Sequence, residues 1–121
     1  MAELSQSLKG RLDPESTAVC EWFCDHDGKR VEFEVRTGEG QSVSETATVK
    51  AEALSVNDYG WISVRMVDGA IGSPGELQIP AMDEPDGCRI ESHSASADAI
   101  SWRDLTPGAY GGHRDYEVRV L

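Results

Sequence analysis

The chain has 121 residues, 39% of them hydrophobic, and this is enough to bury one core but not two. Its 22 acidic residues against 11 Lys and Arg residues give a formal net charge of −11 at pH 7, so we expect no direct binding to nucleic acid or to an anionic membrane. No apolar run approaches the roughly 20 residues that cross a bilayer, and the N-terminus lacks the pattern of a secretory signal, so we expect a cytoplasmic or virion-associated location.

The first segment, residues 1–13, is predicted to be an arm or a short helix. Leu4, Leu8 and Leu12 recur every four residues, which places them on one face of a helix. Pro14 separates this segment from the rest of the chain. We expect Leu4 and Leu8 of this arm to dock on a neighbouring subunit, as the arms of assembly proteins often do.

Residues 19–35, with the sequence VCEWFCDHDGKRVEFEV, are predicted to form a β-hairpin. The Asp27–Gly28 pair favours the two-residue turn that joins antiparallel strands. In that register one face of the hairpin is apolar and the other is mostly charged. The apolar face carries Cys20, Trp22, Cys24, Val31, Phe33 and Val35. Phe23 falls on the charged face, where we expect it to contact a partner.

The hairpin argues against a shared metal site or disulfide for Cys20 and Cys24. Four residues along a strand span about 13 Å, whereas zinc holds sulfur at about 2.3 Å and a disulfide needs Cα atoms within about 7 Å. On a helix the same spacing would bring the two side chains together. His26 lies at the predicted turn, and Gly28 does not fall where a calcium loop requires glycine. We therefore expect no metal and no cofactor, with Cys88 as the one further thiol.

Short alternating segments continue to the C-terminus and are separated by turns such as Asp68–Gly69 and Pro74–Gly75. They span residues 60–69, 75–82, 87–94, 98–105 and 115–121. In the first of them Ile62, Val64 and Met66 share one face. Residues 42–56 fit a strand better than a helix, although both stay open. The fold class that we predict for residues 14–121 is mostly β, a single small antiparallel sandwich or barrel, preceded by the short N-terminal helix or arm.

Residues 105–120, LTPGAYGGHRDYEVRV, resemble the corner and strand of fibronectin type III and related sandwich domains. The matching positions are Leu105, Pro107, Gly108, Tyr116, Val118 and Val120. The stretch between Leu105 and Tyr116 is several residues longer than in that family. The resemblance implies a β architecture and carries no function with it.

No catalytic residue is predicted. A strand over ESHSAS would place Glu91 and His93 on one face and Ser92 and Ser94 on the other, which separates the members of a serine-based triad. The chain has no nucleophile elbow, no P-loop and no dinucleotide fingerprint, and His113 in the HRD sequence lacks the other elements of a kinase.

The sequence therefore predicts a non-catalytic, acidic protein-binding or assembly module, whose partner is another protein or a second copy of the chain. A structural subunit of a larger particle, such as a phage-type virion, fits these properties. Tyr59, beside Gly60, is a further candidate for the partner contact. An acidic inhibitor or immunity-type protein that blocks a basic site is the alternative, and a small hydrolase is a third. The acidity itself has three open explanations: solubility, adaptation to salt or a basic partner, and mimicry of nucleic acid.

Overall fold

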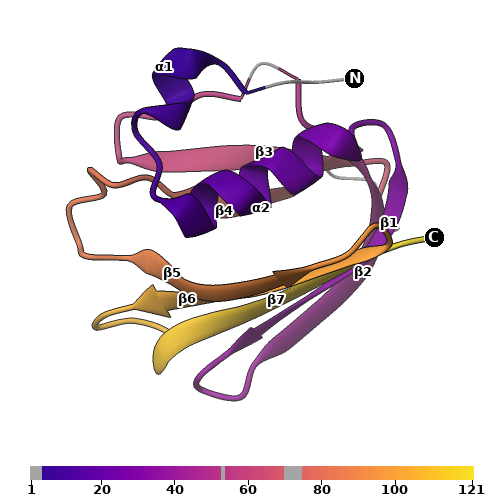
Figure 1. Cartoon of the computed structure of the whole chain (residues 1–121). Helices are drawn as coiled ribbons and strands as arrows, with labels where there is room; N and C mark the ends of the chain where they lie inside the picture. Colours follow the sequence, from indigo (N-terminus) through magenta and orange to yellow (C-terminus); the bar gives the residue numbers. More distant parts are fainter. Residues whose placement is uncertain (1–3, 53, 70–74) are drawn as a thin grey trace.

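The computed structural model describes residues 4–52, 54–69 and 75–121 (Figure 1). Within them, two helices precede seven strands. The helices are α1, Gln6–Lys9, and α2, Pro14–Asp25; the strands are β1, Arg30–Thr37; β2, Ser42–Lys50; β3, Trp61–Val67; β4, Gly75–Pro80; β5, Arg89–Ala95; β6, Ala99–Thr106; and β7, Gly112–Val120. Pro74, of the predicted Pro74–Gly75 turn, lies outside the described residues.

The described strands form one antiparallel sheet in the order β4-β3-β2-β1-β7-β6-β5, which curls into a half-barrel (Figure 1). The prediction of a small, mostly β, antiparallel domain with a short N-terminal helix is confirmed. Residues 42–50 are strand β2, so the helical alternative for this segment is excluded. The C-terminal stretch that resembles fibronectin type III forms the end of β6, a turn and β7, in one continuous sheet.

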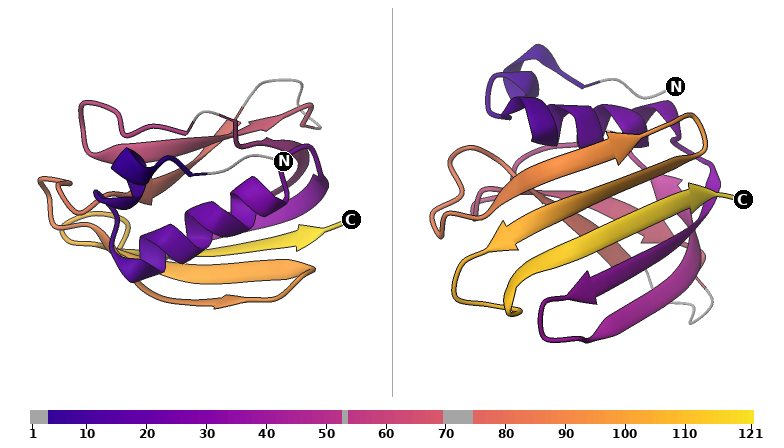
Figure 2. Two further views of the ribbon diagram at one scale, coloured as in Figure 1. Left: turned by 45° about the horizontal axis from the view of Figure 1, so that its top comes forward. Right: turned by 60° about the horizontal axis from the view of Figure 1, so that its bottom comes forward.

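The sheet bends most sharply where β2 meets β3. These two strands pair at only three positions, Thr48 to Lys50 with Val67 to Arg65, whereas β1 and β2 pair at seven. β3 and β4 therefore swing away from the plane of the other strands. Figures 1 and 2 show β3 and β4 on one side of helix α2 and β5 to β7 on the other.

The segment predicted as the first strand of a hairpin is helix α2, so the predicted hairpin over residues 19–35 is wrong. The helix begins at Asp13, whose side chain accepts a hydrogen bond from the backbone N–H of Ser16 at 2.8 Å. Pro14 occupies the first turn, where an N–H has no helical partner to lose. These start signals precede residue 19, the first residue of the predicted hairpin. Gly28, with a φ of 84°, turns the chain from the helix region into β1.

Helix α2 closes the half-barrel by covering both edges of the sheet. The Ser16 hydroxyl donates to the Pro80 carbonyl of β4 at 2.9 Å. At the other edge, the Trp22 indole N–H donates to the carbonyl of Ser96, which follows β5, at 2.8 Å. Exposed edge strands invite pairing with other chains, so this cover protects the sheet from such pairing. Phe23 is fully buried beneath the helix, where it packs edge-on against Trp102.

The N-terminal arm packs on its own domain. Leu4, Leu8 and Leu12 are all buried in the core. The backbone carbonyl of Arg11 accepts a hydrogen bond from the Met82 N–H at 2.9 Å, and its guanidinium pairs with Asp83. The leucine stripe is therefore covered within the chain itself.

Candidate functional site

A surface cleft lies between the start of β3, the connection from β4 to β5, and the turn from β6 to β7. It has a volume of about 710 Å³. We call it the aromatic cleft. Its principal residues are Tyr59, Trp61, Asp86, Cys88, Tyr110 and Arg114.

A tight turn before β3 positions the first wall of the aromatic cleft. The Asn57 side-chain oxygen accepts hydrogen bonds from the backbone N–H groups of Tyr59 at 2.9 Å and Trp61 at 3.1 Å. Gly60 has a φ of 80°, and a Cβ atom at this position would lie 2.7 Å from the Cα of Glu84. The turn thus presses against the β4–β5 connection and leaves Tyr59 75% exposed.

The turn from β6 to β7 supplies the second wall. The backbone N–H of Ala109 donates to the Thr106 carbonyl at 3.1 Å, and the Thr106 hydroxyl donates to the Ala109 carbonyl at 2.9 Å. Tyr110 lies in this turn with a φ of 53°, which is uncommon for a residue other than glycine. Its side chain is 44% exposed.

Arg114 forms the floor between the two walls. Its guanidinium carbon lies 4.8 Å from the ring centre of Tyr110, 5.7 Å from that of Trp61 and 5.6 Å from that of Tyr116. These distances are within the range of cation–π attraction. Arg114 therefore contacts aromatic side chains from both sides of the half-barrel, and its own side chain is only 15% exposed.

A buried carboxylate holds Arg114 in place. Asp104 is fully buried, and its Oδ2 accepts a hydrogen bond from Arg114 Nη2 at 3.0 Å. Its other oxygen, Oδ1, and Arg114 Nε have no hydrogen-bond partner among the described residues. Burial raises the pKa of Asp104 to about 6 even though Arg114 opposes the shift, and Glu84 adds to it.

The surroundings of the aromatic cleft are negative on balance. Glu84 is 8% exposed and accepts hydrogen bonds from the backbone N–H groups of Asp86 at 3.0 Å and Cys88 at 2.6 Å. Burial, together with Glu84 and Asp104, raises the pKa of Cys88 to about 11, so this thiol is protonated at neutral pH. Asp86 thus lines the aromatic cleft, Glu84 holds the backbone of two of its residues, and Asp104 bonds to Arg114, so three carboxyl groups accompany the single guanidinium of Arg114.

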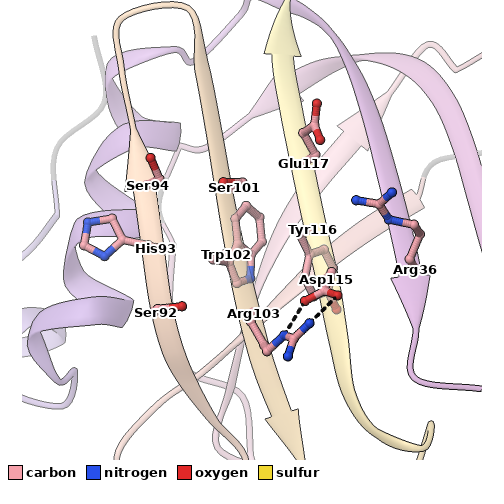
Figure 3. Close-up of a pocket in the computed structure, with 10 residues that line it drawn as sticks. All are labelled: Arg36, Ser92, His93, Ser94, Ser101, Trp102, Arg103, Asp115, Tyr116 and Glu117. Carbon is pink, nitrogen blue, oxygen red and sulfur yellow. Dashed lines mark hydrogen bonds and ion pairs between the residues drawn. The ribbon is translucent and has the colours of Figure 1, made fainter.

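A second, smaller concavity of about 380 Å³ lies on the outer face of β5, β6 and β7 (Figure 3). The side chains of Ser92, Ser94 and Ser101 line it. Arg103 forms a bidentate ion pair with Asp115, with N–O distances of 2.7 and 3.0 Å. Arg103 lowers the pKa of Asp115, so both groups stay charged. This concavity is therefore a polar surface with a satisfied ion pair.

His93 does not face the serines of that concavity. A β-bulge between Ile90 and Ser92 shifts the register, so that His93 lies opposite the buried Trp102 and Ser92 lies opposite Arg103. His93 instead pairs with Glu15 of α2. The bulge interrupts the simple alternation that placed Glu91 on the same face as His93. As predicted, the side chain of His93 lies on the other face of β5 from those of Ser92 and Ser94.

Cys20 and Cys24 lie on helix α2, so the prediction that strand spacing separates their side chains is wrong. Other features decide their chemistry. Both thiols are buried, and burial raises the pKa of Cys20 to about 12 and that of Cys24 to about 11. The two ring nitrogens of His26 lie 2.7 Å from the Trp22 carbonyl and 2.8 Å from the Ala97 carbonyl. Among the described residues, no group of three or more metal-ligating side chains gathers around a common point.

The predicted contact residues fall into two groups. Leu4, Leu8 and Phe23 are buried in the core, so the expectation that Phe23 is exposed on a charged face is wrong. Tyr59 is exposed at the rim of the aromatic cleft. Arg114, Trp61 and Tyr110, which complete the aromatic cleft, were not predicted from the sequence. A signal existed, because Arg114 shares the inward alternation of Tyr116 and Val118, where a charged side chain is unusual.

Comparisons of the chain with protein-family models, with curated protein sequences and with solved structures found no match. In the described part of the chain, no helix has the length and apolar character needed to span a bilayer.

Proposed function

We propose that this protein is a non-catalytic binding module that assembles with a protein partner through the aromatic cleft. The observation that carries the proposal is the pair of exposed tyrosines, Tyr59 and Tyr110, on two sides of a concavity whose floor is Arg114. Tyrosine, tryptophan and arginine are the residues that most often dominate the binding energy of protein interfaces. Trp61 adds a third aromatic ring to the same site.

Charge complementarity favours a basic protein surface as the partner. The chain carries a net charge of −11, and the carboxyl groups around the cleft outnumber the one guanidinium. Such a field attracts a positively charged surface and repels an acidic one. A second copy of the chain carries the same negative charge, so a different, basic partner is favoured over self-association. We infer that a partner segment places an apolar or aromatic side chain between Tyr59 and Tyr110 and basic side chains on the rim.

The proposal includes the setting in which the module works. A structural role in a larger particle, such as a virion, and a cytoplasmic location both accord with it. The second candidate is an acidic inhibitor or immunity-type protein, which the net charge of −11 favours. The two differ in what binding does, because an inhibitor abolishes an activity of its partner and an assembly module does not. A small hydrolase is the third candidate and is disfavoured, because His93 and Ser92 are neighbours on strand β5 and their side chains point to opposite faces.

A displayed library of random peptides, selected on the purified protein, tests the proposal. We expect selected peptides to combine an apolar or aromatic residue with flanking Lys or Arg, and to bind less tightly at about 500 mM than at about 50 mM salt, because salt screens the charges. The double variant Tyr59→Ala, Tyr110→Ala should lose this binding. Val43→Ala is the matched control, because Val43 is 60% exposed on β2 and does not line the aromatic cleft. The proposal is rejected if selection yields no such peptides, or if the double variant binds them as tightly as the wild type.

A further inference from the structure

The pair of Asp104 and Arg114 has a feature that binding of a partner does not require. Asp104 is fully buried on the inner face of β6, and one of its two oxygens has no hydrogen-bond partner among the described residues. Buried carboxylates are normally satisfied on both oxygens, because an unsatisfied one carries the full cost of its lost hydration. The orphaned oxygen is a site where a proton can add without breaking an existing hydrogen bond.

Arg114 depends on Asp104 for its position. Its hydrogen bond to Asp104 is the one that the described residues provide for the guanidinium. The same guanidinium contacts Trp61 on β3 and Tyr110 in the β6–β7 turn, which are the two walls of the aromatic cleft. A change at Asp104 therefore reaches both walls through Arg114.

The charged and titratable groups around Asp104 come from three directions. Arg114 and Tyr116 face it from β7, and Glu84 and Cys88 face it from the β4–β5 connection. Helix α2 also packs against β6, and Glu15 of this helix is paired with His93 of β5. Arg114 favours the ionised form of Asp104, whereas burial and Glu84 disfavour it.

We propose that the Asp104–Arg114 pair is a proton-operated latch: a proton from solvent adds to Asp104 Oδ1, Arg114 loses its counter-charge, and the aromatic cleft binds its basic partner less well. The inference rests on the proposed function, because it concerns regulation of that same cleft. Two effects act in the same direction. Protonation removes one negative charge beneath the cleft, and it leaves the Arg114 guanidinium uncompensated, which repels a basic partner.

Burial and Glu84 raise the pKa of Asp104, Arg114 lowers it, and the resulting pKa is about 6. Protonation of Asp104 therefore occurs in mildly acidic solution. If the partner binds the ionised form better, binding must lower the pKa of Asp104 by a matching amount. A difference of one pKa unit between the free and bound protein corresponds to an affinity change of about tenfold.

A titration of the free protein tests the latch without any partner. In wild-type protein labelled with ¹³C at the Asp carboxyl groups, the Asp104 signal should shift with a midpoint near pH 6. The side-chain N–H signals of Arg114 and Trp61 should shift with the same midpoint. The Asp104→Asn variant should lose this transition, and Asp115→Asn should keep it, because Asp115 pairs with Arg103 on the outer face. A midpoint near pH 4, or a transition at Asp104 that leaves Arg114 and Trp61 unmoved, would overturn the proposal.

A binding measurement then tests the consequence for the partner. With a free pKa of about 6 and a one-unit difference on binding, a selected basic peptide without histidine should bind wild-type protein about fivefold less tightly at pH 5 than at pH 7.5. The Asp104→Asn variant should change by less than about twofold over the same interval, since it has no proton to gain there. Equal pH dependence in both proteins would overturn the latch while leaving the binding function intact. Failure to select any peptide would reject the binding function, and the titration of the free protein would still decide whether Asp104 and Arg114 move together.

Discussion

Replacing Asp104 by Asn should change how the stability of the protein depends on pH. The pKa of Asp104 is raised from an ordinary 3.8 to about 6 in the folded protein, with burial as the main cause. The unfolded chain therefore releases its proton near pH 3.8, whereas the folded protein holds it until about pH 6. Between these values the folded state binds more protons, so the contribution of Asp104 to stability falls as the pH rises.

The size of this effect follows from the shift. One pKa unit corresponds to about 1.4 kcal/mol, so a rise of about two units costs the folded state about 3 kcal/mol once the pH exceeds 6. This cost is absent below pH 3.8 and constant above pH 6. Asn has nearly the same shape as Asp and carries no charge, so the Asn variant should escape the cost and keep an acceptor for Arg114.

Urea unfolding of wild type and Asp104→Asn at intervals from pH 3.5 to pH 7.5 measures the effect. Other carboxyl groups titrate in the same interval. Subtracting the free energy of unfolding of wild type from that of the variant at each pH removes their contribution. We expect the free energy of unfolding of the variant, relative to wild type, to rise by about 3 kcal/mol over this range. A difference that stays constant would refute the reasoning. A difference that falls with pH would show that Arg114 outweighs burial and holds the pKa of Asp104 below its ordinary value.

Three further predictions concern the helix that closes the half-barrel. Phe23→Ala should lower the free energy of unfolding, measured in urea, by about 3 to 5 kcal/mol, because Phe23 is fully buried. The control Val43→Ala, on the exposed part of β2, should change it by less than about 0.5 kcal/mol. Similar losses in the two variants would contradict the placement of α2. Asp13→Ala should cost about 1 kcal/mol in the same assay by removing the N-cap of α2, and an unchanged stability would argue against a helix start there. Cys20 and Cys24 should resist a thiol reagent at pH 8 in the folded protein and react once urea unfolds it, since both are buried with raised pKa values; fast reaction of the native protein would contradict their burial.

The strands were predictable because their alternation has a single physical cause. Ile62, Val64 and Met66 were expected on one face of a strand, and all three are buried on β3. The half of the false hairpin that follows residue 28 is also a strand, with Val31 and Phe33 buried as expected. A sheet with one face on the core imposes a period of two residues, and the sequence records that period directly.

Helix α2 was mispredicted because its sequence satisfies two periods at once. Cys20, Trp22 and Cys24 alternate as in a strand, whereas Val19, Cys20 and Phe23 have the spacing of a helix face. All of these residues are buried, because the helix is enclosed between the two halves of the sheet. An enclosed helix buries more than one stripe, so its pattern loses the polar positions that distinguish it from a strand.

The aromatic cleft could not be predicted because it depends on the path of the sheet. Tyr59, Tyr110 and Arg114 come together only because β3 separates from β2 after three paired positions and folds over the other strands. Nothing local to these residues records that separation. Asp104 alternates with the buried residues Ile100 and Trp102 on β6, and this pattern indicates a buried carboxyl group. The pattern does not indicate that Arg114 is its partner.

The affinity of wild-type protein and of the Tyr59→Ala, Tyr110→Ala variant for a selected basic peptide, measured by calorimetry at low salt, tests the central claim most directly. Interface tyrosines of this kind contribute about 1 kcal/mol or more each, so we predict that the double variant binds at least about 30-fold less tightly. Its far-ultraviolet circular dichroism should remain that of the wild type, because both side chains are exposed. Equal affinity of a folded double variant would contradict the account of the aromatic cleft as the binding site.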